Sequence, residues 1–347
     1  MAEEVWMLQT KKADFKQIGA RFRIDPVTAR IIRNRGIEGE AAIDRYLNGT
    51  LDDLYDPMLL KDMERAVSIL CEAVDTGKKI RIVGDYDIDG VCSTYILLQA
   101  FERLGSDVDF EIPDRIKDGY GINESIIEQA HADGVEVILT CDNGISAFHQ
   151  VELAKKYGMT VVITDHHEVP LDGEKEKIPP ADAVIDPKQA DCPYPFPEIC
   201  GAVVAYKLVQ VLYARRGVPQ MEWLDLLEFA AIATVGDVMK LQDENRILVK
   251  YGLKKMAQTK NLGLRRLAEK NNLDLGAITA YHIGFVIGPC LNAGGRLKTA
   301  KEALALLRAQ SDEEAERLAE ELKELNDTRK DMTEQGTEAA KLQVESW

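Results

Sequence analysis

The stretch that decides the fold is Ile80-Arg81-Ile82-Val83-Gly84-Asp85-Tyr86-Asp87-Ile88-Asp89-Gly90. Its first four residues have the length and largely apolar character of a buried strand, and the glycine after them opens a loop. The three aspartates at alternate positions repel one another in that loop. Divalent cations take oxygen ligands, so the pattern indicates a metal site, with a solvated Asp-Gly turn as the alternative.

Strand and helix patterns alternate from residue 61 to residue 186. An amphipathic helix at 61–76 is expected to lead into the first strand. The expected strands are 80–83, 108–112, 135–140, 159–164 and 182–185, and the helices between them are 91–104, 125–132 and 145–157. Ser125 and Glu128 have capping-box spacing for the second of these helices. This alternation predicts an α/β fold with a doubly wound parallel sheet.

Metal-type side chains follow four of the five expected strands. They are Asp85, Asp87 and Asp89 after the first, Asp142-Asn143-Gly144 after the third, Asp165-His166-His167 after the fourth, and Asp186 after the fifth. The carboxyl ends of parallel strands share one edge, where ligands bind. Asp142 alone could cap a helix, and Asp186 before Pro187 could form a turn. The coincidence of all four predicts a metal site at this edge.

The expected ligands are carboxylates and one or two imidazoles, without thiolates, which suits manganese or magnesium. Five or six ligands exceed what one ion needs if substrate must also bind, so we expect two ions. Two ions about 3.5–4 Å apart are the usual arrangement for in-line attack of water on phosphorus. The sequence therefore predicts hydrolysis of a phosphoester or phosphoanhydride.

Beyond residue 200 the pattern is mainly helical. Helices are expected near 200–215, 221–235, 246–257, 263–270, 276–284 and 300–309. We expect four regions: a helical cap (1–60), a catalytic domain (61–245), a helical substrate-binding region (246–310) and an acidic inter-domain helix (311–347). The basic pairs Lys254-Lys255 and Arg265-Arg266 could line a path for a single strand, although a solvated face is the commoner explanation.

The composition favours a cytoplasmic protein. The six cysteines form no C-x-x-C pair, which indicates free thiols. The start, Met1-Ala2-Glu3-Glu4, lacks the apolar segment of a signal peptide, and no run reaches membrane-spanning length, so no membrane partner is expected. The net charge of −16 is unfavourable for binding nucleic acid. Metal-binding carboxylates and the acidic segment 312–324 account for part of that charge, so nucleic acid is not excluded.

The stretches Asp165-His166-His167, Asp142-Asn143-Gly144 and Gly84 to Gly90 resemble the motifs of the DHH phosphoesterase superfamily. Other stretches resemble its RecJ branch, the bacterial exonucleases that degrade single-stranded DNA from 5′ to 3′. They are Asp56-Pro57-Met58-Leu59-Leu60-Lys61-Asp62-Met63, Pro113-Asp114-Arg115 with Gly119-Tyr120-Gly121, Cys200-Gly201-Ala202, Gly236-Asp237-Val238-Met239, and Ile287-Gly288-Pro289 with Asn292-Ala293-Gly294-Gly295-Arg296-Leu297. The resemblance covers nearly the whole chain and implies a DHH phosphoesterase core.

The resemblance also implies roles for individual residues. The metal ligands would be Asp85, Asp87, Asp89, Asp142, His166 and Asp237, and the catalytic residues would be Asp142, Asp165 and His167. Asp142 would bridge the ions, Asp165 would orient a histidine, and His167 would stabilise the scissile phosphate or protonate the leaving oxygen. Arg115 and Arg296 would hold substrate phosphates, with Asn292 shaping the loop that presents Arg296. Without the resemblance, Gly236-Asp237 would be interpreted as a helix C-cap and either arginine as a surface ion-pair partner.

One feature departs from the RecJ pattern. RecJ proteins normally continue past a long helix into a second domain with a Gly-Gly-His motif, and often into an OB-like domain, but this sequence has no such motif. It stops at Trp347 after an acidic helix with heptad-like apolar spacing. We therefore expect a catalytic-core fragment or a naturally short relative, with the following domain missing.

The resulting hypothesis is a two-metal exodeoxyribonuclease that releases 5′-mononucleotides from the 5′ end of single-stranded DNA in DNA repair and recombination. The resemblance implies manganese or magnesium as cofactor and a single-strand-binding protein as a partner. Three alternatives stay open: a DHH enzyme that cleaves short oligoribonucleotides, cyclic dinucleotides or pyrophosphate; a non-catalytic RecJ-like scaffold; and an isolated core that binds metal and a DNA end but turns over poorly. The segment 292–297 argues against the first, and the filled metal positions argue against the second.

Overall fold

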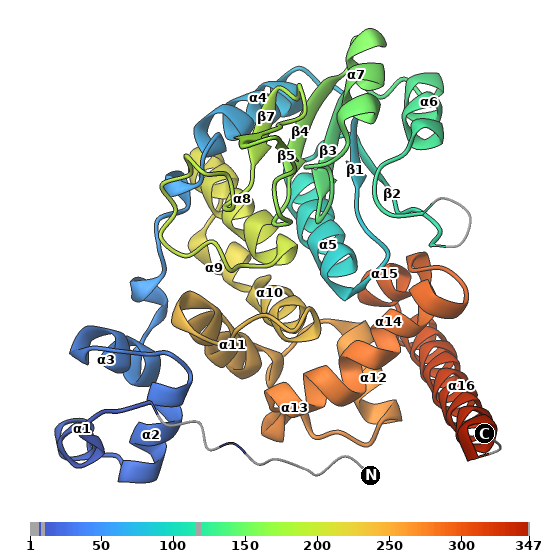
Figure 1. The fold of residues 1–347 in the computed structure, drawn as a ribbon. Helices are drawn as coiled ribbons and strands as arrows, with labels where there is room; N and C mark the ends of the chain where they lie inside the picture. Colours follow the sequence, from blue (N-terminus) through green and yellow to red (C-terminus); the bar gives the residue numbers. More distant parts are fainter. Residues whose placement is uncertain (1–6, 8–10, 116–118, 346–347) are drawn as a thin grey trace.

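The structure is a computed structural model that describes residue 7, residues 11–115 and residues 119–345 (Figure 1). The acidic start at residues 1–4 and the final Trp347 lie outside the described residues. A five-stranded parallel sheet has the order β2-β1-β3-β4-β7. Its strands are β1 (Ile80–Val83), β2 (Val108–Glu111), β3 (Val137–Cys141), β4 (Thr160–Thr164) and β7 (Ala183–Ile185). The predicted α/β fold with a parallel sheet is confirmed.

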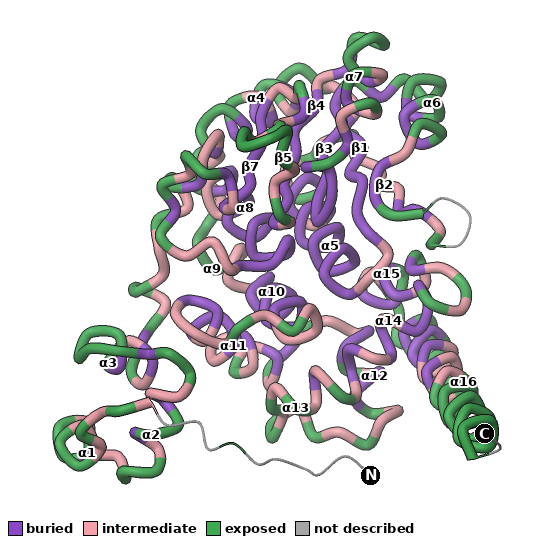
Figure 2. The backbone as a smooth tube through the Cα atoms, in the orientation of Figure 1, coloured by how far each residue is buried: buried purple, intermediate pink, exposed green. Residues whose placement is uncertain are grey.

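Helices cover both faces of the sheet, so that alternate strand residues enter two different cores. On one face, α4 (Met63–Asp75), α5 (Ile88–Arg103) and α8 (Gly201–Arg216) pack on side chains such as Leu139. On the other, α6 (Glu124–Ala132) and α7 (Phe148–Lys156) pack on its neighbour Ile138. Burial on both faces explains why β3 and β4 are nearly continuous apolar runs, whereas the edge strand β2 is only half-buried and carries Asp109 and Glu111 (Figure 2). The N-cap of α6 is Asn123, whose side chain accepts a hydrogen bond from the N–H of Ile126. The capping position expected at Ser125 was therefore wrong by two residues.

The helical region follows the sheet in the chain and lies below it in Figure 1. Its helices are α9 (Gln220–Leu224), α10 (Leu227–Gly236), α11 (Asp243–Met256), α12 (Leu262–Lys270), α13 (Ala280–His282), the π-helix η4 (Ile283–Ile287), α14 (Gly288–Leu297), α15 (Lys301–Leu307) and α16 (Asp312–Glu345). Before the sheet, α1 (Phe15–Phe22), α2 (Pro26–Asn34) and α3 (Glu40–Asn48) surround a small separate core that includes Ile32 and Tyr46. Short 3-10 turns occur at Leu51–Asp53 (η1), Pro57–Leu59 (η2) and Leu275–Ala277 (η3), and β5 (Leu171–Asp172) pairs with β6 (Lys175–Glu176). Among the described residues, no helix is long and apolar enough to cross a membrane.

Three sequence predictions for the helical region need correction. The single helix expected at 221–235 is two helices, because a turn at Asp225 lets Trp223 pack against Tyr206. The helix expected at 276–284 is instead a 3-10 turn, a short α-helix and the start of a π-helix. The loop expected to present Arg296 is helix α14, whose glycines allow close packing rather than ending the helix. A Cβ at Gly295 would lie 2.3 Å from the carbonyl oxygen of Tyr86.

Candidate active site

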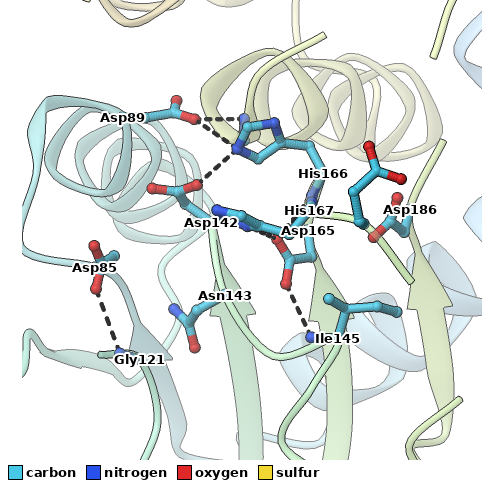
Figure 3. Close-up of polar contacts among 12 residues, drawn as sticks. Asp85, Asp89, Gly121, Asp142, Asn143, Ile145, Asp165, His166, His167 and Asp186 are labelled. Atoms are coloured by element: carbon cyan, nitrogen blue, oxygen red, sulfur yellow. Dashed lines mark hydrogen bonds and ion pairs between the residues drawn. The ribbon is translucent and has the colours of Figure 1, made fainter. Parts of the chain in front are cut away.

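Acidic and imidazole side chains from three strand ends meet at the carboxyl edge of the sheet (Figure 3). The Nε2 atom of His166, after β4, lies 3.0 Å from Oδ1 of Asp142, after β3. The same nitrogen lies 3.4 Å from Oδ2 of Asp89, after β1, and 4.0 Å from Oδ2 of Asp237, at the end of α10. Asp237, from the helical region, therefore joins a cluster whose other members follow strands of the sheet.

Two helix N-termini hold the carboxylates that follow β1. Asp87 caps α5 by accepting hydrogen bonds of 2.9 and 3.1 Å from the backbone N–H groups of Asp89 and Gly90. Asp89 accepts two bonds of 2.7 Å from the N–H groups of Gly201 and Ala202, at the start of α8. Unpaired N–H groups and the helix dipole stabilise negative charge at these positions, so the fold fixes the orientation of both carboxylates before any ligand binds.

Asp142 adopts a left-handed backbone conformation with φ of 60°. It does not cap α7, whose first residue is Phe148 and whose N-cap is Ala147, so the capping explanation of Asp142 is excluded. The hydroxyl of Tyr120 donates to the carbonyl oxygen of Asp142 at 2.9 Å. A Cβ at Gly201 would lie 2.7 Å from the Cβ of Asp142. The unusual backbone conformation is thus stabilised by a hydrogen bond and by packing that only glycine permits.

Asp165 and His167 form a second, linked pair. Oδ1 of Asp165 lies 2.7 Å from Nδ1 of His167, and Oδ2 accepts a 2.9 Å bond from the N–H of Ile145. Burial alone would raise the pKa of Asp165, but the hydrogen bond and charge of His167, the N–H of Ile145 and the charge of His166 together lower it. Burial alone would lower the pKa of His167, but the hydrogen bond to Asp165 and the negative charges around the imidazole together raise it. Asp165 is buried, whereas the side chain of His167 is 44% exposed.

The cluster fits hard divalent cations. Ligand atoms lie within 4.8 Å of one another in one group of Asp85, Asp87 and Asp142 and in another of Asp89, His166 and Asp237. The contact between Asp142 and His166 joins the two groups. Burial raises the pKa of Asp85 to about 7, with Asp87 adding to the rise. Positive charge lowers the pKa of nearby carboxylates, so a donor set of this kind is suited to cations.

Two buried atoms support the same conclusion. Oδ2 of Asp85 and Nδ1 of His166 have no hydrogen-bond partner among the described residues. Buried polar atoms are normally paired, so each such atom calls for an explanation, such as a ligand. Asp186, the fourth strand-end aspartate, belongs to neither donor group. Its Oδ1 accepts a bond of 2.8 Å from the N–H of Lys188, which forms the turn that the sequence also allowed.

The expected substrate residues lie beside the donor groups. Asn292 and Arg296 line a cavity of about 150 Å³ together with Arg329. Arg296 is exposed and has no ion-pair partner in the part of the chain that the structure describes. The guanidinium of Arg115 lies 5.3 Å from the centre of the Tyr86 ring. Tyr86 belongs to residues 85–89, which we call the aspartate loop. We call the cavity lined by Asn292, Arg296 and Arg329 the arginine slot.

Sequence reasoning missed two residues at the site, Tyr120 and Arg329. Tyr120 contacts both Asp142 and His167, with its hydroxyl 3.1 Å from Nε2 of His167. The quoted stretch Gly119-Tyr120-Gly121 contained the signal, since an aromatic residue between two glycines stands in a loop beside the sheet edge. Arg329 gave no such signal, because it lies on the long charged helix α16, where arginine is ordinary.

Comparisons with known proteins indicate one family. Residues 79–234 match the family described as DHH family, N-terminal domain. A Bacillus subtilis protein named single-stranded-DNA-specific exonuclease RecJ is 37% identical over 341 residues, which are 98% of this chain and 42% of that protein. The chain spans about half the length of the curated relatives it matches, from 42% to 56% for the first three.

The solved structures that resemble this chain include RecJ proteins. A crystal structure of exonuclease RecJ bound to manganese has a TM-score of 0.71 at 35% identity, and the match covers 79% of this chain and 68% of the other. A second, of RecJ in complex with Mn²⁺ from Thermus thermophilus, has a TM-score of 0.77 at 32% identity and covers 92% of this chain and 44% of the other. The fold, the strand-end motifs and these similarities agree, and the chain belongs to the DHH family, in its RecJ branch.

Proposed function

We propose that this chain is a metal-dependent exodeoxyribonuclease that degrades single-stranded DNA from the 5′ end and releases 5′-mononucleotides. The observation that carries the proposal is the contact between Asp142 and His166, which joins two donor groups beside the arginine slot. Two adjacent cation sites with cationic side chains next to them suit the hydrolysis of a phosphodiester. The names of the RecJ relatives support the choice of single-stranded DNA.

The cofactor of the proposal is a pair of Mn²⁺ or Mg²⁺ ions. The residues that would hold them are Asp85, Asp87, Asp89, Asp142, His166 and Asp237, and the two RecJ crystal structures with manganese support the choice of metal. When bound, such ions activate water and stabilise charge on phosphoryl oxygens. In the reaction, the oxygen of water forms a bond to phosphorus and gives up a proton, the bond to the 3′-oxygen breaks, and that oxygen takes up a proton.

The chain's own residues position the substrate for this reaction. Asp165 holds Nδ1 of His167, and the hydroxyl of Tyr120 lies 3.2 Å from Nδ1 and 3.1 Å from Nε2 of the same ring. In our proposal, Nε2 hydrogen-bonds the scissile phosphate or gives a proton to the leaving 3′-oxygen. Arg296 and Arg115 bind phosphates of the substrate, since a planar guanidinium can donate two parallel hydrogen bonds to phosphate oxygens. Asn292 shapes the slot through its place on α14.

We further propose a role in DNA repair and recombination, in the cytoplasm, with a single-strand-binding protein as a partner. The support for this role is membership in the RecJ branch alone. The proposed division of the chain stays as in the sequence analysis, with a cap at 1–60, a catalytic domain at 61–245, a substrate-binding region at 246–310 and a linking helix at 311–347.

The test is release of nucleotides from a long single-stranded DNA labelled at either end, in Mn²⁺ and in Mg²⁺. We expect release from the 5′ end, and none from Asp142→Asn. Asparagine tolerates the left-handed conformation of Asp142, so this variant removes one charge while retaining the backbone. Release from the 3′ end, or full activity of the variant, would contradict the proposal. Activity confined to dinucleotides would favour the oligonucleotide phosphodiesterase.

A further inference from the structure

Two large aromatic side chains stand exposed next to each other on the helical region. Tyr281 is 64% exposed and Phe285 is 68% exposed. Their ring centres are 4.8 Å apart with an angle of 25° between the planes, so the rings are stacked on each other in solvent. Exposed aromatic patches are uncommon on soluble proteins and often mark interaction sites. We call this pair the aromatic step.

The aromatic step is connected to the arginine slot through one residue. Gly284 lines the slot together with Gly236 and Arg296, and Phe285 is the next residue in the chain. Phe285 lies in the π-helix Ile283–Ile287, a rare conformation that occurs often at functional sites, and Tyr281 lies in the short helix α13 just before it. The aromatic step therefore adjoins, in the chain, a residue of the cavity that two arginines line.

The same surface contacts the aspartate loop directly. A Cβ at Gly236 would lie 2.6 Å from Ile88, and one at Gly288 would lie 3.4 Å from the same side chain. Ile88 lies between the expected metal ligands Asp87 and Asp89. The π-helix and α14 thus pack against the loop that holds the donor groups, so a polymer in the slot would extend from the cluster towards the step.

A strained residue lies at the same rim. Val238 follows Asp237, is 87% exposed and has φ of 58°, a left-handed conformation that β-branched residues rarely adopt. This conformation ends α10 as a Schellman cap, in which the N–H of Met239 donates to the carbonyl oxygen of Thr234 and the N–H of Val238 donates to that of Val235. Val238 lies two residues beyond Gly236, which lines the slot.

We propose that Tyr281 and Phe285 bind nucleobases of single-stranded DNA by stacking while the adjacent arginines hold its phosphates. The proposal rests on the function proposed above and adds a base-binding subsite to it. A cationic groove next to aromatic rings is the combination that binds single strands without sequence preference, because every base has a flat face. Arg296, exposed and without an ion-pair partner among the described residues, supplies the charge that an apolar protein partner would not need.

The test uses oligonucleotides in which 2-aminopurine, a base whose fluorescence is quenched by stacking, replaces one base at successive positions from the 5′ end. Binding is measured in the Asp142→Asn background so that the DNA stays intact. We expect quenching at one or two neighbouring positions. Phe285→Leu and Tyr281→Leu should each restore the fluorescence there and weaken binding about tenfold. Phe285→Trp should keep both the quenching and the affinity.

Tyr157→Leu is the matched control. Tyr157 is a partly exposed ring that stacks on His131 and follows α7, at the opposite end of the sheet from the donor groups. The Tyr157→Leu variant should leave quenching and affinity unchanged, and thermal melts should show that all variants fold.

Unchanged quenching in both step variants, or no quenching at any position, would overturn the aromatic step. If nucleotide release persists in wild type in that case, the nuclease proposal stands; if quenching occurs without release, the step stands and the nuclease proposal fails.

Discussion

The amide nitrogen of Gly201 lies 2.7 Å from Oδ2 of Asp89. This hydrogen bond joins the first turn of α8 to the carboxylate of Asp89, in the first turn of α5. The same glycine leaves space for Asp142, because a Cβ at position 201 would lie 2.7 Å from the Cβ and 3.0 Å from the Cα of Asp142. One residue without a side chain therefore sets the positions of two expected metal ligands.

Gly201→Ala should impair the site although position 201 supplies no ligand. The added methyl group must displace Asp142, and overpacking of this kind costs about 1–3 kcal/mol. We expect weaker Mn²⁺ binding, measured by calorimetry, and slower nucleotide release. The matched control is Gly336→Ala, since Gly336 lies in α16 with nothing within 4 Å of its Cβ position. Equal activity of the two variants would show that the close approach is unimportant.

Manganese should stabilise the folded protein. A ligand that binds only the native state at 100 times its Kd adds about 2.7 kcal/mol, which raises the melting temperature by several degrees. The rise should be reversed by a chelator and should be much smaller in Asp142→Asn, because Asp142 contacts both donor groups. The measurement is a thermal melt at increasing Mn²⁺ concentration. An undiminished rise in the variant would place the metal elsewhere.

Asp165→Asn should lower kcat more than it lowers metal affinity. Asp165 lies 2.7 Å from His167 and belongs to neither donor group, so its loss disturbs the orientation of the imidazole. Loss of such an orienting carboxylate typically costs 10- to 100-fold, so we expect roughly that decrease in kcat. Steady-state kinetics beside Mn²⁺ calorimetry would measure both effects. A large fall in metal affinity with little change in kcat would contradict the orienting role.

Arg296→Ala should weaken DNA binding while leaving metal binding intact. Its guanidinium lines the arginine slot and is exposed. Loss of one phosphate contact should reduce affinity similarly for all sequences and lower the slope of log affinity against log salt by about 1. Arg317→Ala is a suitable control, since Arg317 is 59% exposed and pairs with Glu321 on α16. An unchanged salt slope would remove Arg296 from the substrate site.

The free energy of unfolding should fall as the pH rises from about 5 to about 7, because of Glu228. This residue lies at the start of α10, at the opposite end of the helix from Asp237 and the metal cluster. Burial raises its pKa to about 7, against a hydrogen bond from Thr259 and the charge of Lys255, which lower it. The folded state therefore keeps a proton that the unfolded state loses near pH 4.5, and this preference is lost as pH rises through 7. Glu228→Gln should be more stable than wild type at pH 8, by at most about 3 kcal/mol.

Denaturant unfolding of both proteins at pH 5 and pH 8 would measure this difference. The control is Glu222→Gln on the neighbouring helix α9, where Arg103 pairs with the carboxylate and lowers its pKa, so the variant should gain nothing at pH 8. A Glu228→Gln advantage that is the same at both pH values would show that the carboxyl group does not titrate in this range.

Much of the site could be predicted because its chemistry is local in sequence. Asp85, Asp142 and Asp165 each follow a strand, and parallel strands deliver their ends to one edge whatever the rest of the chain does. Asp237 came only from the family resemblance, since a C-cap aspartate carries no signal of its own. The helix α14 was mistaken for a loop because its glycines resemble helix breakers.

The sequence by itself determined the parallel sheet, the order of its strands in the chain and the acidic edge, because apolar periodicity and strand-end residues are set within a few positions. Only the tertiary structure decided which distant segments complete the site: Gly201 against Asp142, Gly295 against Tyr86, and Arg329 in the slot with Arg296. Those contacts depend on how helices pack over long separations in the chain. Packing of that kind is decided by the shapes of whole surfaces, which no local pattern of residues encodes.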